Sequence, residues 1–493
     1  MRSGRVGDRR DCPDLTPLKI NHTILSMPTD LWQRSASEIA ANYESAECSP
    51  VELVVAVLDR IEKVNPLLNA IVTLDIEGAR AAAEASEVRW RKGTPLGPFD
   101  GVPITVKDNI PVRGLRATWG SKLYANFVSP IDELPIARLR SGGAVILGKT
   151  NCPEFTLQGY TDNLLFGPTR NPWSLALTPG GSSGGAAAAV CAGLGSIAIG
   201  TDGGGSIRRP ASHTGLVGLK PSRGRVPRCG GFPAILLDFE TVGPMTRTVA
   251  DLVTTMDLMS SPDRRDPLSL FFANRPFESE SLSASRILFV PRFDTSPVDP
   301  EIATSVANAA KALADLGHIV EDGTAPFDVD ALTQPWSVIS QVGLAWLLRS
   351  HADHQGKLTP AIEEMAVKGS TVTATEYYAA LEAIKALQAN LSLFFEGYDL
   401  IMTPSAAALP WPAEKAFPQI IGGQEVGPRG HAIFTAFANM TGCPGISIPA
   451  NPSTVGLPIG FQLVSALGRD GLLCSVAAQF EAARPWVDRR PPL

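Results

Sequence analysis

Two serines that are 24 residues apart stand in the most glycine-rich part of the chain. Ser182 lies within residues 178–185, and Ser206 follows three consecutive glycines at 203–205. Glycines allow several backbone N–H groups to converge on one point and leave room for a substrate carbonyl, which is what an oxyanion hole requires. The apolar residues around this segment, such as Ile207, argue against a flexible surface loop. The pattern favours a nucleophile loop with Ser206 as its reactive serine.

Other interpretations of the same segment need features that the sequence lacks or leaves open. A phosphate-binding loop ends in Gly-Lys-Ser/Thr and a dinucleotide fingerprint has a different glycine spacing, so neither nucleotide site is predicted. Residues 180–184 do satisfy the G-x-S-x-G elbow of α/β-hydrolases, which would make Ser182 the nucleophile. That mechanism requires a later histidine, and His431 has the best position in chain order. The elbow therefore stays open on the residues alone.

A lysine is the other candidate base. Lys107 directly follows the apolar run 102–106 and precedes Asp108. Serine–lysine pairs replace serine–histidine pairs in some hydrolases. An ordinary lysine has a pKa of about 10.4, and burial lowers that pKa by up to about 3–5 units, which would make a neutral base available near pH 7. Two interpretations stay equally open: a buried base, and a lysine that reaches the surface or pairs with Asp108.

At these residues the chain resembles the amidase signature family of serine amidohydrolases. The central motif extends over residues 180–210 almost without gaps and is highly specific. Further stretches similar to the family's motifs lie at 101–109, 148–155, 166–173, 215–221, 439–445 and 456–462. The departures are few: Gly203 is often a bulkier residue in the family, and Ser222 stands where a threonine is usual. The resemblance covers the chain from about residue 30 to about residue 485.

The resemblance implies a role for each matching residue, without metal or cofactor. Ser206 matches the nucleophile, Ser182 the serine that follows a cis peptide bond, and Lys107 the catalytic lysine. The implied mechanism is a proton relay in which neutral Lys107 accepts a proton through Ser182 while Ser206 attacks the amide carbonyl. The backbone N–H groups that match the oxyanion hole belong to Gly203, Gly204, Gly205 and Ser206. The residues that match supporting positions are Gly181, Ser183, Asp202 and Arg208.

Strands and helices in alternation must hold these loops. Ser49, Pro50 and Glu52 predict the capped start of a helix that ends at Asn65-Pro66. Short apolar runs predict buried strands at 102–106, 144–147, 286–290, 399–403, 445–449 and 459–464, and helical patterns cover 75–91, 183–195, 300–316, 360–367 and 374–396. Together with the resemblance, this predicts an α/β fold, the amidase signature fold with a central mixed β-sheet flanked by helices on both sides. We expect residues 28–493 to form a single amidase domain and residues 1–27 to be a disordered or misassigned N-terminal extension.

Composition restricts the partners. A net charge of −6 and a pI near 5.7 argue against nucleic acid, and no apolar run is long enough to cross a bilayer. Seven scattered cysteines without a C-x-x-C pair are typical of reduced thiols in a cytoplasmic protein. Six histidines without a ligand cluster predict no metal site. We expect a small-molecule amide-type substrate, and a homodimer stays open.

The substrate itself is not fixed by the sequence. Aryl or alkyl amides, carbamates, hydrazides and esters all fit an acyl-enzyme mechanism. Aromatic residues that would suit an apolar acyl pocket are Phe155, Tyr160, Trp173, Trp336 and Trp346, although each is more often a core residue. The main alternative function is that of the glutaminase component of a glutamyl-tRNA amidotransferase, which needs a second protein as its partner. The weaker alternative is a non-catalytic binding scaffold, which has no need for both serines and the lysine.

Overall fold

The computed structural model describes residues 31–278, 280, 283–351 and 354–493. Its centre is one eleven-stranded mixed sheet, in which β2 pairs in parallel with β3 and β4 while most strands of the middle are antiparallel. The strands, in their order across the sheet, are β1 (Ile71–Leu74), β3 (Val145–Thr150), β2 (Pro103–Lys107), β4 (Ile197–Asp202), β6 (Thr241–Thr246), β5 (Val217–Lys220), β12 (Gly445–Pro449), β13 (Gly460–Ser465), β9 (Leu400–Pro404), β7 (Arg286–Phe289) and β8 (Ile319–Asp322). The short strands β10 (Ile420–Ile421) and β11 (Gln424–Glu425) form a separate hairpin.

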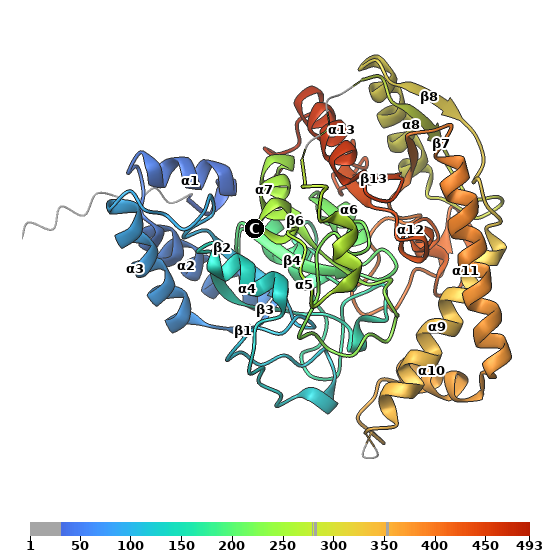
Figure 1. The fold of residues 1–493 in the computed structure, drawn as a ribbon, viewed down its shortest axis with the longest axis horizontal. Coiled ribbons are helices and arrows are strands. Elements are labelled where there is room, and N and C mark those ends of the chain that lie inside the picture. Colours follow the sequence, from blue (N-terminus) through green and yellow to red (C-terminus); the bar gives the residue numbers. More distant parts are fainter. Residues whose placement is uncertain (1–30, 279, 281–282, 352–353) are drawn as a thin grey trace, which may run out of the picture.

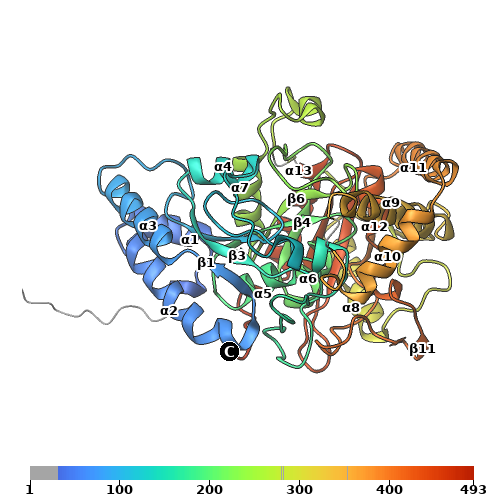
Figure 2. The same ribbon diagram turned by 90° about the horizontal axis from the view of Figure 1, so that it is seen from below.

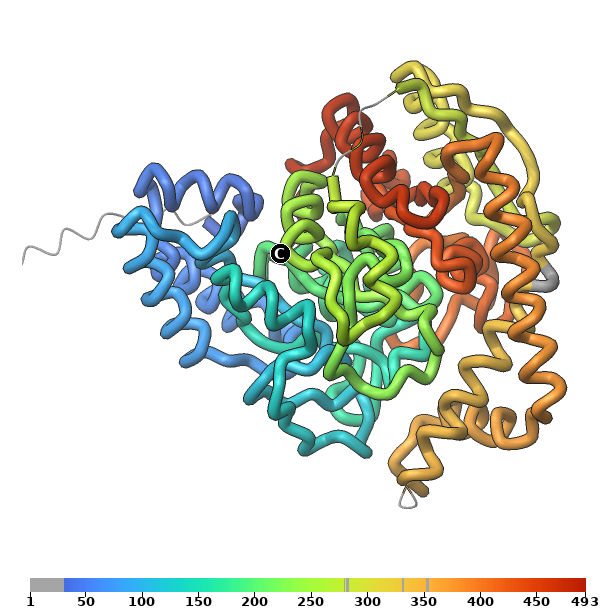
Figure 3. Tube along the Cα trace, viewed as in Figure 1, coloured from blue at the N-terminus to red at the C-terminus, as the bar shows by residue number. Residues whose placement is uncertain are grey.

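Helices surround this sheet. In Figures 1 and 3, the first three helices lie at one end of the molecule, and α9, α10 and α11 lie at the opposite end. The helices are α1 (Ala36–Glu44), α2 (Pro50–Leu68), α3 (Ile76–Arg91), α4 (Leu134–Ser141), α5 (Gly184–Cys191), α6 (Arg208–Thr214), α7 (Val249–Met259), α8 (Pro300–Asp315), α9 (Asp330–Leu348), α10 (Pro360–Thr371), α11 (Ala374–Phe394), α12 (Ala436–Thr441) and α13 (Asp470–Ala483).

Side chains alternate between two hydrophobic clusters along the central strand β4. On β4, Ile197 and Ile199 join a core that includes residues of α7, α8 and α13, whereas Ala198 between them packs with residues of α5 and α6. Figure 2 shows α7 and α13 above the central strands and α5 and α6 below them. The predicted α/β fold with a mixed sheet between two helical layers is therefore confirmed.

Helix α2 shows where local sequence signals succeed and where they fail. Its predicted capping box is present, since the Ser49 hydroxyl accepts from the Glu52 N–H and the Glu52 carboxylate accepts from the Ser49 N–H at 2.8 Å. The predicted end at Pro66 is wrong, because α2 continues to Leu68. A proline in the last turn costs one backbone hydrogen bond, and the buried side chain of Leu68 favours completing that turn. The predicted N-terminal extension, residues 1–27, lies outside the described residues.

The sheet brings two strand ends together where the loops of interest begin. β2 and β4 are parallel neighbours with Val106 opposite Ile199, so their carboxyl ends at Lys107 and Asp202 lie at the same edge. Helix α5 starts directly after Ser183, and α6 starts directly after Ile207. Within the described ranges, no helix is both long and apolar enough to cross a membrane.

The N-terminal helix α1 is held to the core by one carboxylate. Asp251 of α7 is buried and accepts from the N–H groups of Ala36 and Ser37, both at 2.9 Å, and so satisfies donors that a first helical turn leaves unpaired. We expect Asp251→Ala to weaken the docking of α1. Amide hydrogen exchange in residues 36–44 should then accelerate by roughly tenfold or more, because charge-assisted hydrogen bonds contribute about 1.5–3 kcal/mol each.

Asp257→Ala is the matched control, since Asp257 lies on the exposed side of the same helix. Equal exchange rates in α1 for both variants would contradict the role given to Asp251.

Candidate functional site

The Lys107 ammonium lies among oxygens at the end of β2. Its Nζ donates to the Ser182 hydroxyl at 2.8 Å, to the Thr201 hydroxyl at 2.9 Å and to the Thr201 carbonyl at 3.3 Å. Asn109 extends this network, because its side-chain amide donates to the same Thr201 hydroxyl at 3.1 Å. Two of the predicted site residues, Lys107 and Ser182, are thus in direct contact although 75 residues separate them in the sequence.

Lys107 is fully buried, and burial lowers its pKa to about 8 because a charged ammonium loses its hydration there. The neighbouring Asp108 does not neutralise it, since the Asp108 carboxylate accepts from the N–H of Thr118 and lies 3.9 Å from Lys149. The interpretation of Lys107 as a surface lysine or an Asp108 partner is therefore wrong.

Ser182 and Ser183 connect the two serine loops. The peptide bond between Gly181 and Ser182 is cis, and a Cβ on Gly181 would lie 2.3 Å from the Tyr160 carbonyl oxygen. The Ser183 hydroxyl donates to the Thr201 carbonyl at 3.1 Å, and its N–H donates to the Ser206 carbonyl, also at 3.1 Å. The chain before α5 and the chain after β4 are therefore held side by side.

The three glycines of the glycine loop, residues 203–206, each lie close to a side chain of another segment. Gly205 has a φ of +113°, which favours glycine, and a Cβ there would lie 2.2 Å from the Thr435 hydroxyl. A Cβ on Gly203 would lie 2.6 Å from Leu236, and one on Gly204 would lie 3.0 Å from the Trp336 indole nitrogen. Ser206 keeps 7% of its surface exposed. Glycine at Gly203 is consistent with this packing, because a larger residue would collide with Leu236.

A buried ion pair fixes the backbone of this loop. Asp202 and Arg208 are both fully buried, and their side chains meet at 3.0 Å. Burial alone would raise the pKa of Asp202, but the Arg208 guanidinium and backbone N–H groups hold it well below its usual range. The Asp202 carboxylate also accepts from the N–H groups of Gly205 at 2.6 Å and Ile207 at 3.0 Å. The Asp202 carboxylate therefore holds the backbone of the loop, and Arg208 holds the carboxylate. These contacts are consistent with the supporting roles predicted for the two residues.

Three further residues hold the loops, and sequence analysis did not single them out. The Arg209 guanidinium donates to the Gly204 carbonyl at 2.7 Å and to the Gly181 carbonyl at 3.2 Å, so it spans both serine loops. Thr435 donates to the Gly204 carbonyl at 2.7 Å, and Asn439 donates to the Asp202 carbonyl at 2.7 Å. Thr435 and Asn439 come from the C-terminal part of the chain. The only sequence signal for their role is that Asn439 begins a stretch resembling a motif of the family.

His431 does not contact either serine loop by a hydrogen bond. It is 2% exposed and packs on Trp411 with ring centroids 4.6 Å apart, and neither ring nitrogen has a hydrogen-bond partner among the described residues. Burial lowers its pKa well below the usual value. The hydroxyl of Ser182 is bonded to lysine instead. The α/β-hydrolase elbow is thus not supported by the geometry.

The five aromatic residues considered for an acyl pocket have different surroundings. Trp336 lies against the glycine loop and donates to the Gly203 carbonyl at 3.0 Å, while Tyr160 borders Gly181. Phe155 is buried in a core cluster, and Trp173 donates to the Thr214 carbonyl. Trp346 is 56% exposed.

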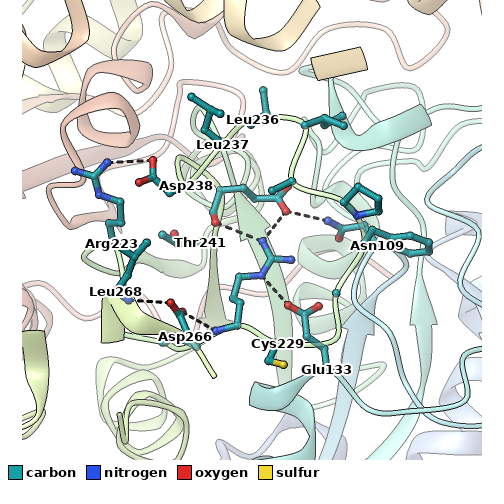
Figure 4. Close-up of a pocket in the computed structure, with 18 of the residues that line it drawn as sticks. Asn109, Glu133, Arg223, Cys229, Leu236, Leu237, Asp238, Thr241, Asp266 and Leu268 are labelled. Carbon is teal, nitrogen blue, oxygen red and sulfur yellow. Dashed lines mark hydrogen bonds and ion pairs between the residues drawn. The ribbon is translucent and has the colours of Figure 1, made fainter. Parts of the chain in front are cut away.

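A cavity of about 360 Å³ lies beside the glycine loop (Figure 4). Its wall includes Leu236, which packs against Gly203, and Asn109, which belongs to the Lys107 network. Charged residues gather in the same hollow, including Glu133, Arg223 and Asp238. In the part of the chain that the structure describes, no group of three or more His, Cys, Asp and Glu side chains is arranged to hold a metal ion.

Comparison with known proteins places this arrangement in a family. The Amidase family pattern matches residues 52–474. An acylamidase of Rhodococcus erythropolis is 36% identical over an alignment of 467 residues, with 93% of this chain and 97% of that protein covered. One component of the glutamyl-tRNA(Gln) amidotransferase of Desulforapulum autotrophicum is 37% identical over 456 residues, covering 85% of this chain and 91% of the relative.

Solved structures agree in fold. A 6-aminohexanoate cyclic dimer hydrolase in complex with its substrate has a TM-score of 0.81 and 32% identity, with 94% of this chain and 99% of the other covered. A bacterial aryl acylamidase of the amidase signature family has a TM-score of 0.84 and 31% identity, with 92% and 97% covered. The predicted family is confirmed: this chain belongs to the Amidase family and is an amide hydrolase.

Proposed function

We propose that the chain hydrolyses a carboxylic amide, or a related carbamate, hydrazide or ester, through an acyl-enzyme on Ser206, with Ser182 and Lys107 as the proton relay. The observation that carries this proposal is the 2.8 Å contact between the Lys107 Nζ and the Ser182 hydroxyl, at a lysine whose pKa is lowered to about 8. A serine beside a lysine that can be neutral is a recognised substitute for a serine–histidine pair.

In the first half of the reaction, Ser206 Oγ forms a bond to the substrate carbonyl carbon. Its proton passes to Ser182, and the proton of Ser182 passes to neutral Lys107. The negative charge that develops on the carbonyl oxygen is stabilised by backbone N–H groups of the glycine loop, residues 203–206. The Gly205 N–H is already bonded to Asp202, so this proposal assigns the remaining N–H groups of the loop to the oxyanion.

In the second half, the relay runs in reverse and then repeats. The carbon–nitrogen bond breaks while Ser182 gives a proton to the leaving nitrogen and takes one from protonated Lys107. Water then attacks the acyl-enzyme and loses its proton to the same relay. As the bond between the acyl carbon and the Ser206 oxygen breaks, the relay returns that proton to the Ser206 oxygen, and the acid is released. The relay ends with neutral Lys107, so protons balance over the cycle. Arg209, which spans both loops, would keep the two serines in register during these steps.

A second candidate is the glutaminase component of a glutamyl-tRNA amidotransferase. It is favoured by the 37% identity to the amidotransferase component of Desulforapulum autotrophicum. Hydrolysis of glutamine by the isolated chain, with co-purification of a second protein from the native host, would support it. Hydrolysis of simple amides without any glutaminase activity would favour the stand-alone amidase. A homodimer and a cytoplasmic location remain predictions. The cytoplasmic location is supported by the six described cysteines, which are all free thiols.

One prediction of this proposal concerns pH. Because Lys107 must be neutral to accept a proton and its pKa is about 8, kcat/KM for an amide should rise as pH increases and level off above that value. Below the pKa the decline should approach tenfold per pH unit, since the neutral fraction falls by that factor. A rate profile from about pH 5.5 to about pH 9.5 checks this. A profile that is flat over that range would contradict a lysine base.

Another prediction concerns the nucleophile. A fluorophosphonate should label Ser206 alone, as measured by intact mass and peptide mapping, because the reagent traps activated serines. Lys107→Met should reduce both the labelling rate and amide turnover by roughly 10³-fold or more, since members of a catalytic unit act together. Lys122→Met, at a lysine outside this network, is the matched control. Labelling of Ser182 instead of Ser206 would reverse the assigned roles.

A further inference from the structure

The lining of the cavity beside the glycine loop combines apolar and charged residues. The apolar ones include Trp119, Phe232, Ile235, Leu236 and Leu237. Figure 4 shows the charged side chains of Glu133, Arg223, Asp238 and Asp266 around the same hollow. A lining of this composition can hold an alkyl chain against its apolar residues and a polar end group against its charged ones.

The charges of the lining do not cancel. Four carboxylates line the cavity, Glu133, Asp238, Glu240 and Asp266, against two guanidinium groups, Arg223 and Arg228. Asp238 is paired with Arg223 at 3.1 Å. A single guanidinium, that of Arg228, is shared by Glu133 at 2.7 Å and Glu240 at 2.9 Å. The Asp266 carboxylate accepts from backbone N–H groups of Arg228 and Leu268. The lining therefore has an excess of negative charge.

One carboxylate oxygen of this lining is left without a partner. Glu133 is fully buried, its Oε1 accepts from Arg228, and its Oε2 has no hydrogen bond in the described part of the chain. A buried polar oxygen without a hydrogen-bond partner is costly, so a donor in the cavity would stabilise it. Figure 4 shows the Glu133 carboxylate among the residues that line the hollow.

Two residues of the cavity lining contact the surroundings of the proposed catalytic residues. The Asn109 amide donates to the Thr201 hydroxyl at 3.1 Å and to Glu240 at 3.5 Å, and Thr201 in turn contacts Lys107. Leu236, an apolar residue of the lining, packs against Gly203. The cavity therefore adjoins the proposed catalytic network through Asn109 and the glycine loop through Leu236.

We propose that this cavity binds a positively charged alkylammonium group of the substrate, so that the enzyme prefers amides of amino-terminated aliphatic acids over amides of uncharged or carboxylate-terminated acids. The inference rests on the proposed acyl-enzyme function. In this proposal the substrate carbonyl lies at the glycine loop, the methylene chain contacts the apolar residues of the cavity, and the ammonium donates to Glu133 and Glu240. A carboxylate in the same position would face like charges and would be disfavoured.

Three p-nitroanilides with the same five methylenes test this preference. They are the 6-aminohexanoyl, heptanoyl and pimeloyl compounds, which end in an ammonium, a methyl and a carboxylate. We expect kcat/KM to be at least roughly tenfold higher for the ammonium than for the methyl compound, and lowest for the carboxylate, as expected for a partly buried opposite charge. Hydrolysis of the heptanoyl compound without any preference for the ammonium would overturn the cavity proposal and leave the amidase proposal standing.

Variants of the carboxylates assign the preference to the cavity. Glu240→Gln and Glu133→Gln should each reduce the ratio of ammonium to methyl turnover, whereas Glu321→Gln, at an exposed pair on β8, should leave it unchanged. The charge of Glu240 also acts on Lys107, so Glu240→Gln can change turnover of every substrate. We therefore compare the ratio of ammonium to methyl turnover within each variant, in which an equal effect on both substrates cancels. An unchanged ratio in both cavity variants would overturn the proposal.

A binding measurement separates this proposal from the catalytic one. Hexylammonium, hexanol and hexanoate are titrated into the protein by calorimetry, which needs no turnover. Hexylammonium should bind most tightly, and Glu133→Gln should weaken its binding. Equal affinity for the three ligands would overturn the cavity assignment even if none of the anilides were hydrolysed.

Discussion

The site depends on a lysine that is buried without a carboxylate partner. Three oxygens surround the Lys107 Nζ, and they belong to the Ser182 hydroxyl and to the hydroxyl and carbonyl of Thr201. Hydroxyl and carbonyl oxygens satisfy an ammonium as acceptors but do not compensate its charge, so burial is free to lower the pKa. A carboxylate in contact would favour the charged form and remove the base. The surroundings of Lys107 therefore favour a lysine that can lose its proton, at the expense of the stability that a paired charge would give.

The rest of the fold keeps this environment closed and the loops rigid. Parallel pairing of β2 and β4 brings Lys107 next to Thr201, and Ser183 ties the loop before α5 to the chain after β4. The charges needed to hold the glycine loop are compensated locally, since Asp202 and Arg208 pair with each other in the interior. That pair lies at the end of β4, so it stiffens the loop without placing a carboxylate against Lys107.

Much of this was predictable because the signals are local. The capping box at Ser49, the apolar runs of β2 and β12, and the glycines before Ser206 each have a direct sequence pattern. The contributions of Thr435 and Arg209 were not predictable, because they depend on which chain segments the sheet brings together. Pro66 was misread as a helix end because the burial of Leu68, a tertiary effect, outweighs the lost hydrogen bond. The cavity charges likewise come from segments that are distant in sequence.

Burial alone does not distinguish Lys107 from the other buried lysines of the sheet. Lys107, Lys149 and Lys220 are all fully buried in strands of the central sheet, and burial lowers the pKa of each. Lys149 lies 3.9 Å from the Asp108 carboxylate, which favours its charged form. Lys220 has a pKa of about 7, but its Nζ donates to the Pro221 carbonyl, which has no proton to give. Lys107 donates to a serine hydroxyl, and this contact, rather than the pKa, is the reason that we propose Lys107, and neither of the other two lysines, as the base.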